Sequence, residues 1–306
     1  TSLDAPRILS PMRFPQPVLR ITLSPATDAD QAALPRAAAR FALEDPSLRV
    51  ETDAESGLLV LAGMGELHLE IICDRLRREA GLSFEAGRPT VAYRESLAGT
   101  ASAAGLVRRT VGNHGQFAQV ELTVTPRNAT DGTHIDAAAA GLPTSFANAS
   151  AQGIRQALDH GLFGLPVVDV SAVVTAAESH PVDSTLEAFA GAAAQATRNA
   201  LAAAGTVIIE PVMALEIIVP DAHLGDVLAD LSARQATILE MTARATSRGL
   251  DPHHLVRAEA PLRTLDAYTT HLRSRSQGRA SMSMQFSRFD PAPKAVSEAL
   301  RLGSRT

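Results

Sequence analysis

The chain has 306 residues, of which 45% are hydrophobic and 4% aromatic, so it is long enough for two or three globular domains. It carries 28 basic and 33 acidic residues, and this acidic balance excludes a uniformly basic RNA-binding surface, so any RNA contact has to be local. A single cysteine, Cys73, excludes a disulfide framework and favours the reducing cytoplasm, and no apolar run approaches the roughly 20 residues of a membrane helix.

The first segment, 1–92, alternates short apolar strands with two helices. We expect strands at 18–23, 49–52, 58–62 and 83–85, and helices at 28–43 and 66–80. The second helix follows a Gly-x-Gly turn, and Leu67, Ile71 and Leu76 are predicted to lie on its apolar face. Cys73, in the same helix, is interpreted as a small buried hydrophobic residue. This order of elements predicts a ferredoxin-like split β-α-β module, with both helices on one face of a four-stranded antiparallel sheet.

The middle segment, 93–209, follows a different order. We expect strands at 106–111, 117–125 and 167–176, a helix at 144–160 and a long helix at 184–204. Ser184 and Glu187 have the spacing of a capping box, which predicts Ser184 as the N-cap of the long helix. Ten alanines between Ala188 and Ala204 allow that helix to approach a sheet closely.

The last segment, 210–306, repeats the order of the first. We expect strands at 213–219, 237–245, 255–260 and 280–288, and helices at 224–233 and 264–272. Proline and glycine near residues 87–89 and at 210–211 mark the two boundaries. The predicted fold class is therefore α+β, with two ferredoxin-like modules that flank a central α+β domain.

Two loops of the middle segment are expected to lie together at one end of its sheet. The first contains Gly112, Asn113, His114 and Gln116, and the second contains Ser179, His180, Asp183 and Ser184. The second loop leads into a helix N-terminus, whose unpaired N–H groups suit a phosphate or an RNA surface. His180 adds a hydrogen-bond donor and a stacking ring. A plain hairpin turn for the first loop and an exposed residue without function for His180 are the alternatives.

The most basic stretch of the chain is 271–288. It contains Arg273, Arg275, Gln277 and Arg279, and no carboxylate lies between Asp266 and Asp290. Arginine binds phosphate through paired hydrogen bonds, so this stretch is a candidate RNA contact. A solvated basic loop is the alternative.

Motifs for catalysis are missing from the sequence. A phosphate-binding loop requires Gly-x-x-x-x-Gly-Lys-Ser/Thr, and the only lysine is Lys294, so the chain alone is expected not to bind or hydrolyse GTP. The histidines show no convergent set of three metal ligands, and there is no Gly-x-Ser-x-Gly elbow. We expect no catalytic residue, no metal site and no cofactor in this chain.

The run Leu61-Ala62-Gly63-Met64-Gly65-Glu66-Leu67-His68-Leu69-Glu70, closing on Val91-Ala92-Tyr93-Arg94-Glu95, resembles the third domain of elongation factor G. This GTPase drives tRNA and mRNA through the ribosome, and the resemblance extends to about residue 290. The middle segment resembles domain four of the family, which projects into the decoding site. Ser179-His180-Pro181-Val182-Asp183-Ser184 is similar to the Tyr-His-x-Val-Asp-Ser stretch at its tip, which touches the tRNA–mRNA duplex. The 272–280 stretch is similar to a loop near the GTPase-associated centre of the large subunit.

The resemblance implies that the chain is the carboxy-terminal half of such a factor, domains III, IV and V. GTP and magnesium would bind a GTPase domain that is missing from this sequence. The expected partner is the ribosome, with its ribosomal RNA, tRNA and mRNA, and the expected state is a cytoplasmic monomer. Two departures leave other functions open: the first tip loop is short and lacks lysine, and Ala176-Ala177-Glu178 replaces the usual Asp-Gly-Ser. A recycling or ribosome-protection relative and a stand-alone scaffold without GTPase activity remain alternatives.

Overall fold

The structure is a computed structural model that describes residues 17–53, 57–111, 114–128, 131–138, 140–244 and 252–303, without the side chains at 111, 114, 244 and 303. The chain divides into two compact units. One consists of the described parts of 1–92 and 211–287, and the other of the described parts of 93–210 and 288–306. The second unit therefore joins the end of the chain to the middle segment. Each sheet is described by itself below.

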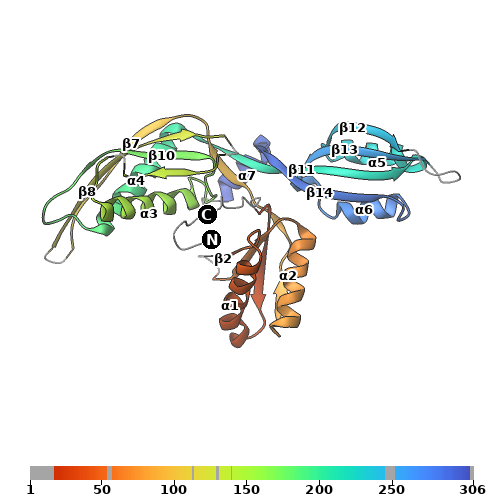
Figure 1. Ribbon diagram of the computed structural model, residues 1–306, viewed down its shortest axis with the longest axis horizontal. Coiled ribbons are helices and arrows are strands. Elements are labelled where there is room, and N and C mark those ends of the chain that lie inside the picture. The colour runs from red at the N-terminus through yellow and green to blue at the C-terminus, as the bar shows by residue number, and fades with distance from the viewer. Residues whose placement is uncertain are drawn as a thin grey trace, which may run out of the picture. The chain divides into compact units, whose positions relative to one another are not determined.

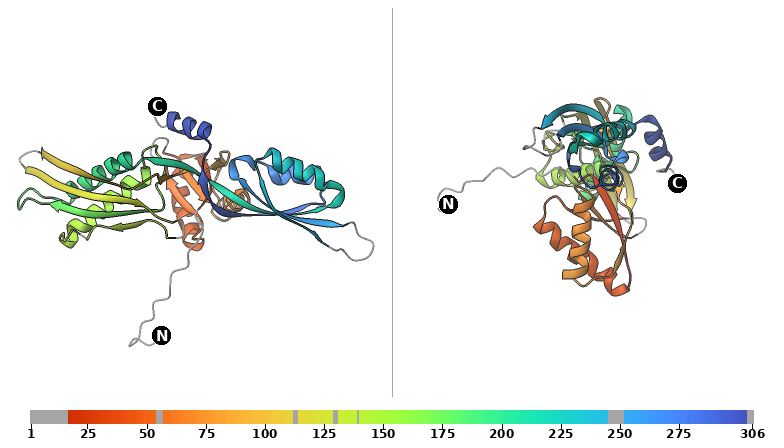
Figure 2. Two further views of the ribbon diagram at one scale, coloured as in Figure 1. Left: turned by 90° about the horizontal axis from the view of Figure 1, so that it is seen from above. Right: turned by 90° about the vertical axis from the view of Figure 1, so that its right-hand side faces the viewer.

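The first module has the predicted split β-α-β order. Its elements are β1 (Leu19–Pro25), α1 (Asp28–Glu44), β2 (Arg49–Thr52), β3 (Leu59–Gly63), α2 (Glu66–Glu79), β4 (Phe84–Ala86) and the short β5 (Thr90–Val91). The strand order is β2-β3-β1-β4, with antiparallel pairing throughout and β5 added to β1. Both helices lie on one side of the sheet (Figure 1; Figure 2, right). The prediction of a ferredoxin-like module is confirmed.

The buried face of α2 differs from the prediction. Leu67 and Ile71 are 69% and 50% exposed, whereas Leu69, Ile72, Cys73 and Leu76 are buried. The end of β3 explains this rotation of the helix, because a Cβ at Gly63 would lie only 2.8 Å from Leu69 Cδ2. Leu69 therefore packs where Gly63 has no side chain. Burial also raises the pKa of the Cys73 thiol, in agreement with an inert core residue.

The middle domain is built on a four-stranded sheet that carries two helices. Its elements are β6 (Arg94–Leu97), β7 (Ala101–Val111), β8 (His114–Pro126), β9 (His134–Asp136), α3 (Thr144–His160), β10 (Val170–Glu178) and α4 (Leu186–Ala204). The order is β7-β8-β10-β9, and β9 runs parallel to β10. A Cβ at Gly105 of β7 would lie 2.1 Å from Ala192 O, and one at Gly153 of α3 would lie 2.1 Å from Ala190 O. Gly105 and Gly153 thus allow the backbone of the alanine-rich α4 to pack closely against β7 and α3, and the close approach predicted from the sequence is present.

The cap of α4 corrects the sequence interpretation. The helix begins at Leu186, and Thr185 is its N-cap, with its side chain accepting a hydrogen bond from Ala188 N at 3.2 Å. Ser184 lies one residue earlier, and its hydroxyl is used elsewhere, so the capping box of Ser184 and Glu187 is wrong. Glu187 remains in the first turn, where its negative charge favours the helix dipole.

A buried carboxylate joins three segments at the base of the middle domain. Glu95 of β6 is fully buried. Its carboxylate oxygens accept hydrogen bonds from Leu162 N at 3.1 and 3.2 Å, from Phe163 N at 2.8 Å and from the Thr206 hydroxyl at 2.7 Å. The carboxylate therefore fixes the turn after α3 against the beginning of the next strand, with which β6 also pairs.

The third module repeats the order of the first. It consists of β11 (Thr206–Pro220), α5 (Asp221–Ala233), β12 (Thr237–Arg244), β13 (His253–Pro261), the 3₁₀ turn η1 (Leu262–Thr264), α6 (Tyr268–Arg275) and β14 (Ser281–Pro291). Its strand order, β12-β13-β11-β14, corresponds to that of the first module. Figure 2, left, shows α5 and α6 on the same side of this sheet. The second ferredoxin-like module is also confirmed.

Two helical features of the last segment were not predicted. The helix expected at 264–272 is divided into η1 and α6, because Ala267 between them has a positive φ of 51°. A further helix, α7 (Lys294–Gly303), follows β14. None of the helices in the described ranges is both long and apolar enough to cross a membrane.

Candidate nucleic-acid interface

The two predicted tip segments meet at one end of the middle-domain sheet. Phe117 N of β8 donates to Asp183 O at 2.8 Å, and the Ser184 hydroxyl donates to Phe117 O at 2.8 Å. The Ser184 oxygen also accepts from His180 N at 2.8 Å. The first two bonds join the loop before α4 to β8 of the β7–β8 hairpin, and the third closes the loop on itself, so the expected proximity of the two segments is confirmed.

The first segment is a tighter hairpin than predicted. Val111 pairs with His114, so His114, Gly115 and Gln116 belong to β8 rather than to a five-residue loop. Gly112 and Asn113, between the strands, lie outside the described residues, as does the His114 side chain. Gln116 Oε1 accepts a hydrogen bond from Arg109 Nε at 2.8 Å, so this amide is already engaged within the hairpin.

Gly115 leaves room for the carboxylate of Asp183 at the tip. A Cβ at this position would lie 2.6 Å from Asp183 Cγ and 2.7 Å from its Oδ1. Contacts below 3.0 Å force something to move, so a side chain at 115 would displace the Asp183 carboxylate, which is the end of a flexible side chain. The sequence shows a glycine at position 115, but only the structure shows that the Asp183 carboxylate lies beside it.

His180 is held in one tautomer by the backbone of its own loop. Its Nδ1 lies 3.4 Å from Val182 N and 3.2 Å from Asp183 N, and both N–H groups donate to it. Nδ1 is therefore the unprotonated nitrogen, and the proton of the neutral ring is assigned to Nε2. The side chain is 52% exposed. The loop thus presents a ring face and an Nε2–H donor to the surroundings.

The charges of the tip are mixed. Asp183 Oδ2 lies 3.3 Å from His180 Nδ1, a contact that is an ion pair only when the imidazole is protonated, and Glu178 ends the neighbouring strand β10. Arg108 and Arg109 are exposed on β7. A neutral His180 can donate a hydrogen bond to a ribose hydroxyl, a base or a phosphate oxygen and can stack on a base. Ser179 is exposed next to it, whereas Asp183 and Ser184 serve to hold the loop.

The second candidate surface is the end of α6 and the loop that follows. Arg273 and Arg275 lie in the last helical turn, where their positive charge favours the helix dipole. Gly278 N donates to Arg273 O at 2.7 Å and Gln277 N to Ser274 O at 3.3 Å, which is a Schellman motif. Gln277 and Gly278 accordingly have positive φ values of 53° and 78°.

A buried serine anchors this loop. Ser276 is fully buried, its hydroxyl donates to Leu272 O at 2.7 Å, and its oxygen accepts from Ala280 N at 3.0 Å. The side chains of the loop are therefore displayed on a fixed backbone.

The three arginines of this surface differ in their availability. The Arg273 side chain forms no hydrogen bond or ion pair with another residue in the described ranges. Arg275 Nη2 lies 3.8 Å from Asp230 Oδ1, and Arg279 Nη2 is 3.2 Å from His223 Nε2. The sequence grouped these arginines together, but their acceptors on α5 were not visible from sequence spacing.

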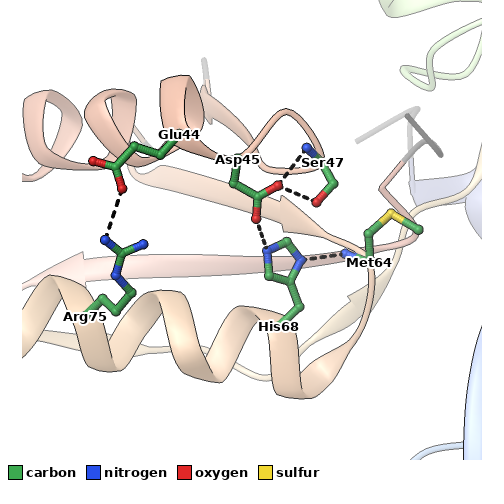
Figure 3. A network of polar contacts seen from close by, with 6 residues as sticks. All are labelled: Glu44, Asp45, Ser47, Met64, His68 and Arg75. Atoms are coloured by element: carbon green, nitrogen blue, oxygen red, sulfur yellow. Dashed lines mark hydrogen bonds and ion pairs between the residues drawn. The ribbon is translucent and has the colours of Figure 1, made fainter. Parts of the chain in front are cut away.

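The histidine of the Gly63–His68 motif has an architectural role (Figure 3). His68 Nδ1 accepts from Met64 N at 3.0 Å, and Nε2 contacts Asp45 Oδ2 at 2.9 Å, so His68 ties the start of α2 to the end of α1. Burial opposes ionisation of Asp45, but hydrogen bonds from the Ser47 hydroxyl and N–H, with His68 nearby, together lower its pKa. In the described part of the chain, no group of three or more His, Cys, Asp or Glu side chains could hold a metal ion.

Comparison with known proteins accounts for nearly the whole chain. Residues 14–88 match the family described as Elongation Factor G, domain III, residues 89–205 match Elongation factor G, domain IV, and residues 207–300 match Elongation factor G C-terminus. A crystal structure of a protein from Thermus thermophilus is 31% identical, with a TM-score of 0.70. The similarity covers 96% of this chain and 44% of that protein, so the present chain spans less than half of its length.

Proposed function

Because the chain belongs to the elongation factor G family of translation factors and consists of its domains III, IV and V, we propose that it is the ribosome-contacting part of a translocation factor. Domain IV would enter the decoding site, where tRNA and mRNA move. GTP hydrolysis in a GTPase domain outside this sequence would drive that movement. The factor would act as a monomer in the cytoplasm.

The tip of domain IV carries this proposal. Its two segments are fixed to each other by Phe117, Asp183 and Ser184, and the bonds to Nδ1 leave the Nε2–H of a half-exposed His180 as an available donor. RNA helices expose 2′-hydroxyls and base edges in a shallow minor groove, and a short, fixed loop with one donor suits such a surface.

The expected site of nucleotide chemistry lies outside this sequence. A phosphate loop needs a lysine after its glycines, and Lys294, in the last helix, is the only lysine. The 306-residue chain alone should therefore show no GTP turnover. Micromolar GTP affinity of this chain in isothermal titration would contradict the proposal that GTP binds only to a separate GTPase domain.

The decisive experiment replaces His180 with alanine in the intact factor. The side chain is half-exposed, so the melting temperature should change little, since surface substitutions usually cost within about 0.5 kcal/mol. Single-turnover translocation should slow. His134→Ala, at an exposed position of β9 in the same domain, is the matched control and should leave both quantities unchanged. A large stability loss with normal kinetics would remove His180 from the site.

The length and charge of the tip favour a second candidate, a factor for ribosome recycling or ribosome protection. Only two residues separate the paired Val111 of β7 and His114 of β8, and the tip contains no lysine. The wild-type factor should then show no activity in translocation assays. Its activity in subunit splitting or in rescue from an antibiotic should be lost in the His180→Ala variant. A scaffold without GTPase activity would show none of these reactions.

The arginine surface of domain V is the proposed contact with large-subunit RNA. Replacing Arg273, Arg275 and Arg279 by alanine should weaken binding to large ribosomal subunits. The slope of log K against the logarithm of the salt concentration, where K is the binding constant, should decrease in magnitude by up to about 0.7–0.9 for each phosphate contact that the substitutions remove. An unchanged slope would identify the arginines as solvated.

A further inference from the structure

One carboxylate of domain V faces two arginines. Asp230 of α5 has a side chain that is only 12% exposed. Its Oδ2 accepts from Arg234 Nε at 3.1 Å, and its Oδ1 lies 3.8 Å from Arg275 Nη2. Asp230 therefore connects the buried side of α5 to the arginine surface at the end of α6.

The two arginines are held very differently. Arg234 is 16% exposed, donates to Thr264 O at 2.6 Å through Nη1, and lies over the Tyr268 ring at 4.7 Å. Arg275 is 50% exposed, and its 3.8 Å distance to Asp230 is longer than a hydrogen bond. Arg234 thus neutralises Asp230 by itself, and Arg275 can leave at little cost.

Among the described residues, neither Tyr268 nor Arg273 competes with the pairing of Asp230 and Arg275. Burial, followed by the nearby Asp230, raises the pKa of Tyr268 to about 12, so its phenol stays neutral. The Arg273 side chain has no hydrogen-bond or ion-pair partner among the described residues, and no carboxylate occurs between Asp266 and Asp290. Asp230 is therefore the acidic group with which Arg275 pairs in the described structure.

We propose that Asp230 is a positioning residue that competes with RNA phosphate for Arg275. In the free protein Asp230 holds Arg275 against α5, and in the bound state Arg275 transfers to a phosphate oxygen while Arg234 keeps Asp230 neutralised. A phosphate can take two guanidinium hydrogen bonds, which the 3.8 Å ion pair does not provide. The loss of the Asp230–Arg275 ion pair on binding lowers the affinity of the protein for RNA and so favours its release from the ribosome after each cycle. This inference rests on the proposed RNA contact of the arginine surface.

The test is a mutant cycle of Asp230→Asn and Arg275→Ala in the 306-residue chain, with isolated large ribosomal subunits as the probe. Asparagine keeps an oxygen acceptor for Arg234 Nε but removes the charge that holds Arg275. The 3.8 Å pair contributes little because Arg275 is half-exposed, so D230N should tighten binding about two- to fivefold. R275A should weaken binding, and D230N should add nothing in the R275A background.

Asp226→Asn is the matched control, because Asp226 is exposed on α5 one turn before Asp230. It removes the same charge without touching Arg275. Equal tightening by D226N, or a D230N effect that persists in the R275A background, would overturn the inference. NMR signals of the Arg275 guanidinium should shift in D230N and not in D226N, and melting temperatures check that the variants fold.

The binding of the triple arginine variant separates the two proposals. If that variant has weaker affinity while D230N binds like the wild type, the competition between Asp230 and phosphate is refuted and the RNA contact stands. If the triple variant binds like the wild type, the RNA contact itself is refuted, and the competition with it.

Discussion

Replacing Glu95 by alanine tests how the base of domain IV is held together. The carboxylate is fully buried and accepts hydrogen bonds from Leu162 N, Phe163 N and the Thr206 hydroxyl. Alanine would remove all of these acceptors and leave two backbone N–H groups and one hydroxyl without them. The turn after α3 would then lose its attachment to β6 and β11.

The expected cost follows from the number of donors left behind. A buried donor without a partner costs about 1–3 kcal/mol, and removal of one side of a buried charged network typically costs about 3–5 kcal/mol. Part of this is offset because the burial of a carboxylate is itself unfavourable. We therefore expect Glu95→Ala to destabilise domain IV by about 3–5 kcal/mol. Glu95→Gln, which keeps one acceptor, should cost about half of that.

The assay has to report on domain IV alone, because a chain with several domains does not unfold in one step. Hydrogen–deuterium exchange at increasing urea concentration, read by mass spectrometry of peptides from 93–209, provides the free energy of opening for this domain. Glu121→Ala, at an exposed position of β8, removes the same charge from the same domain and should cost within about 0.5 kcal/mol.

A specific result would refute the reasoning. That result is a decrease of less than about 1 kcal/mol in the opening free energy of these peptides on Glu95→Ala substitution. The three donors would then bond to water or to other acceptors, and the Glu95 carboxylate would not be needed to hold the turn after α3 in place. Faster exchange at Leu162 and Phe163 alone would mean that only the turn detaches.

Two further predictions concern the other modules. Gln277→Gly should stabilise domain V by about 0.5–1 kcal/mol in urea denaturation, because glycine adopts the positive φ of the Schellman motif without strain, and a loss of stability would show that the Gln277 side chain contributes to folding. Asp45→Asn should destabilise domain III at neutral pH. The pKa of Asp45 is lowered in the folded state, so its stabilisation is present above the unfolded pKa of about 3.9 and is lost as pH falls through the folded pKa. Urea titrations should show the difference between the variant and the wild type becoming smaller as the pH falls below about 4, and a difference that grows in this range would contradict the assignment.

The fold was predictable from the sequence because both outer modules follow strong hydrophobic periodicity. The order of elements and the strands at 49–52 agree with the structure, as does α3 at 144–160. The rotation of α2 was not predictable, since Leu67 and Ile71 have helical spacing as good as that of Leu69 and Leu76. The contact of Leu69 with Gly63 decides between the two faces, and it depends on tertiary packing.

The candidate sites were only partly predictable, because hydrogen bonds between distant segments decide what each side chain does. Ser184 has the spacing of an N-cap, yet its hydroxyl binds Phe117 O, which lies 67 residues away. Asp230 was not recognised, since nothing in the sequence connects it with Arg275 on another helix. Charge counts find an arginine-rich surface, but they do not rank its members by the partners that they already have.

The recognisable motifs of this chain therefore contain residues that only stabilise the fold and residues that also keep a polar group available for a ligand. In the Gly63–His68 run, His68 uses both ring nitrogens within domain III, on Met64 and Asp45. In the Ser179–Ser184 run, Asp183 and Ser184 likewise bond to their own domain, whereas His180 uses only Nδ1 and leaves Nε2 available on a half-exposed ring. A ring nitrogen that is already bonded cannot contact a ligand without a cost to the fold. The available Nε2 of His180 is thus the physical difference between a motif that only builds a turn and a motif that also keeps a hydrogen-bonding group for a ligand.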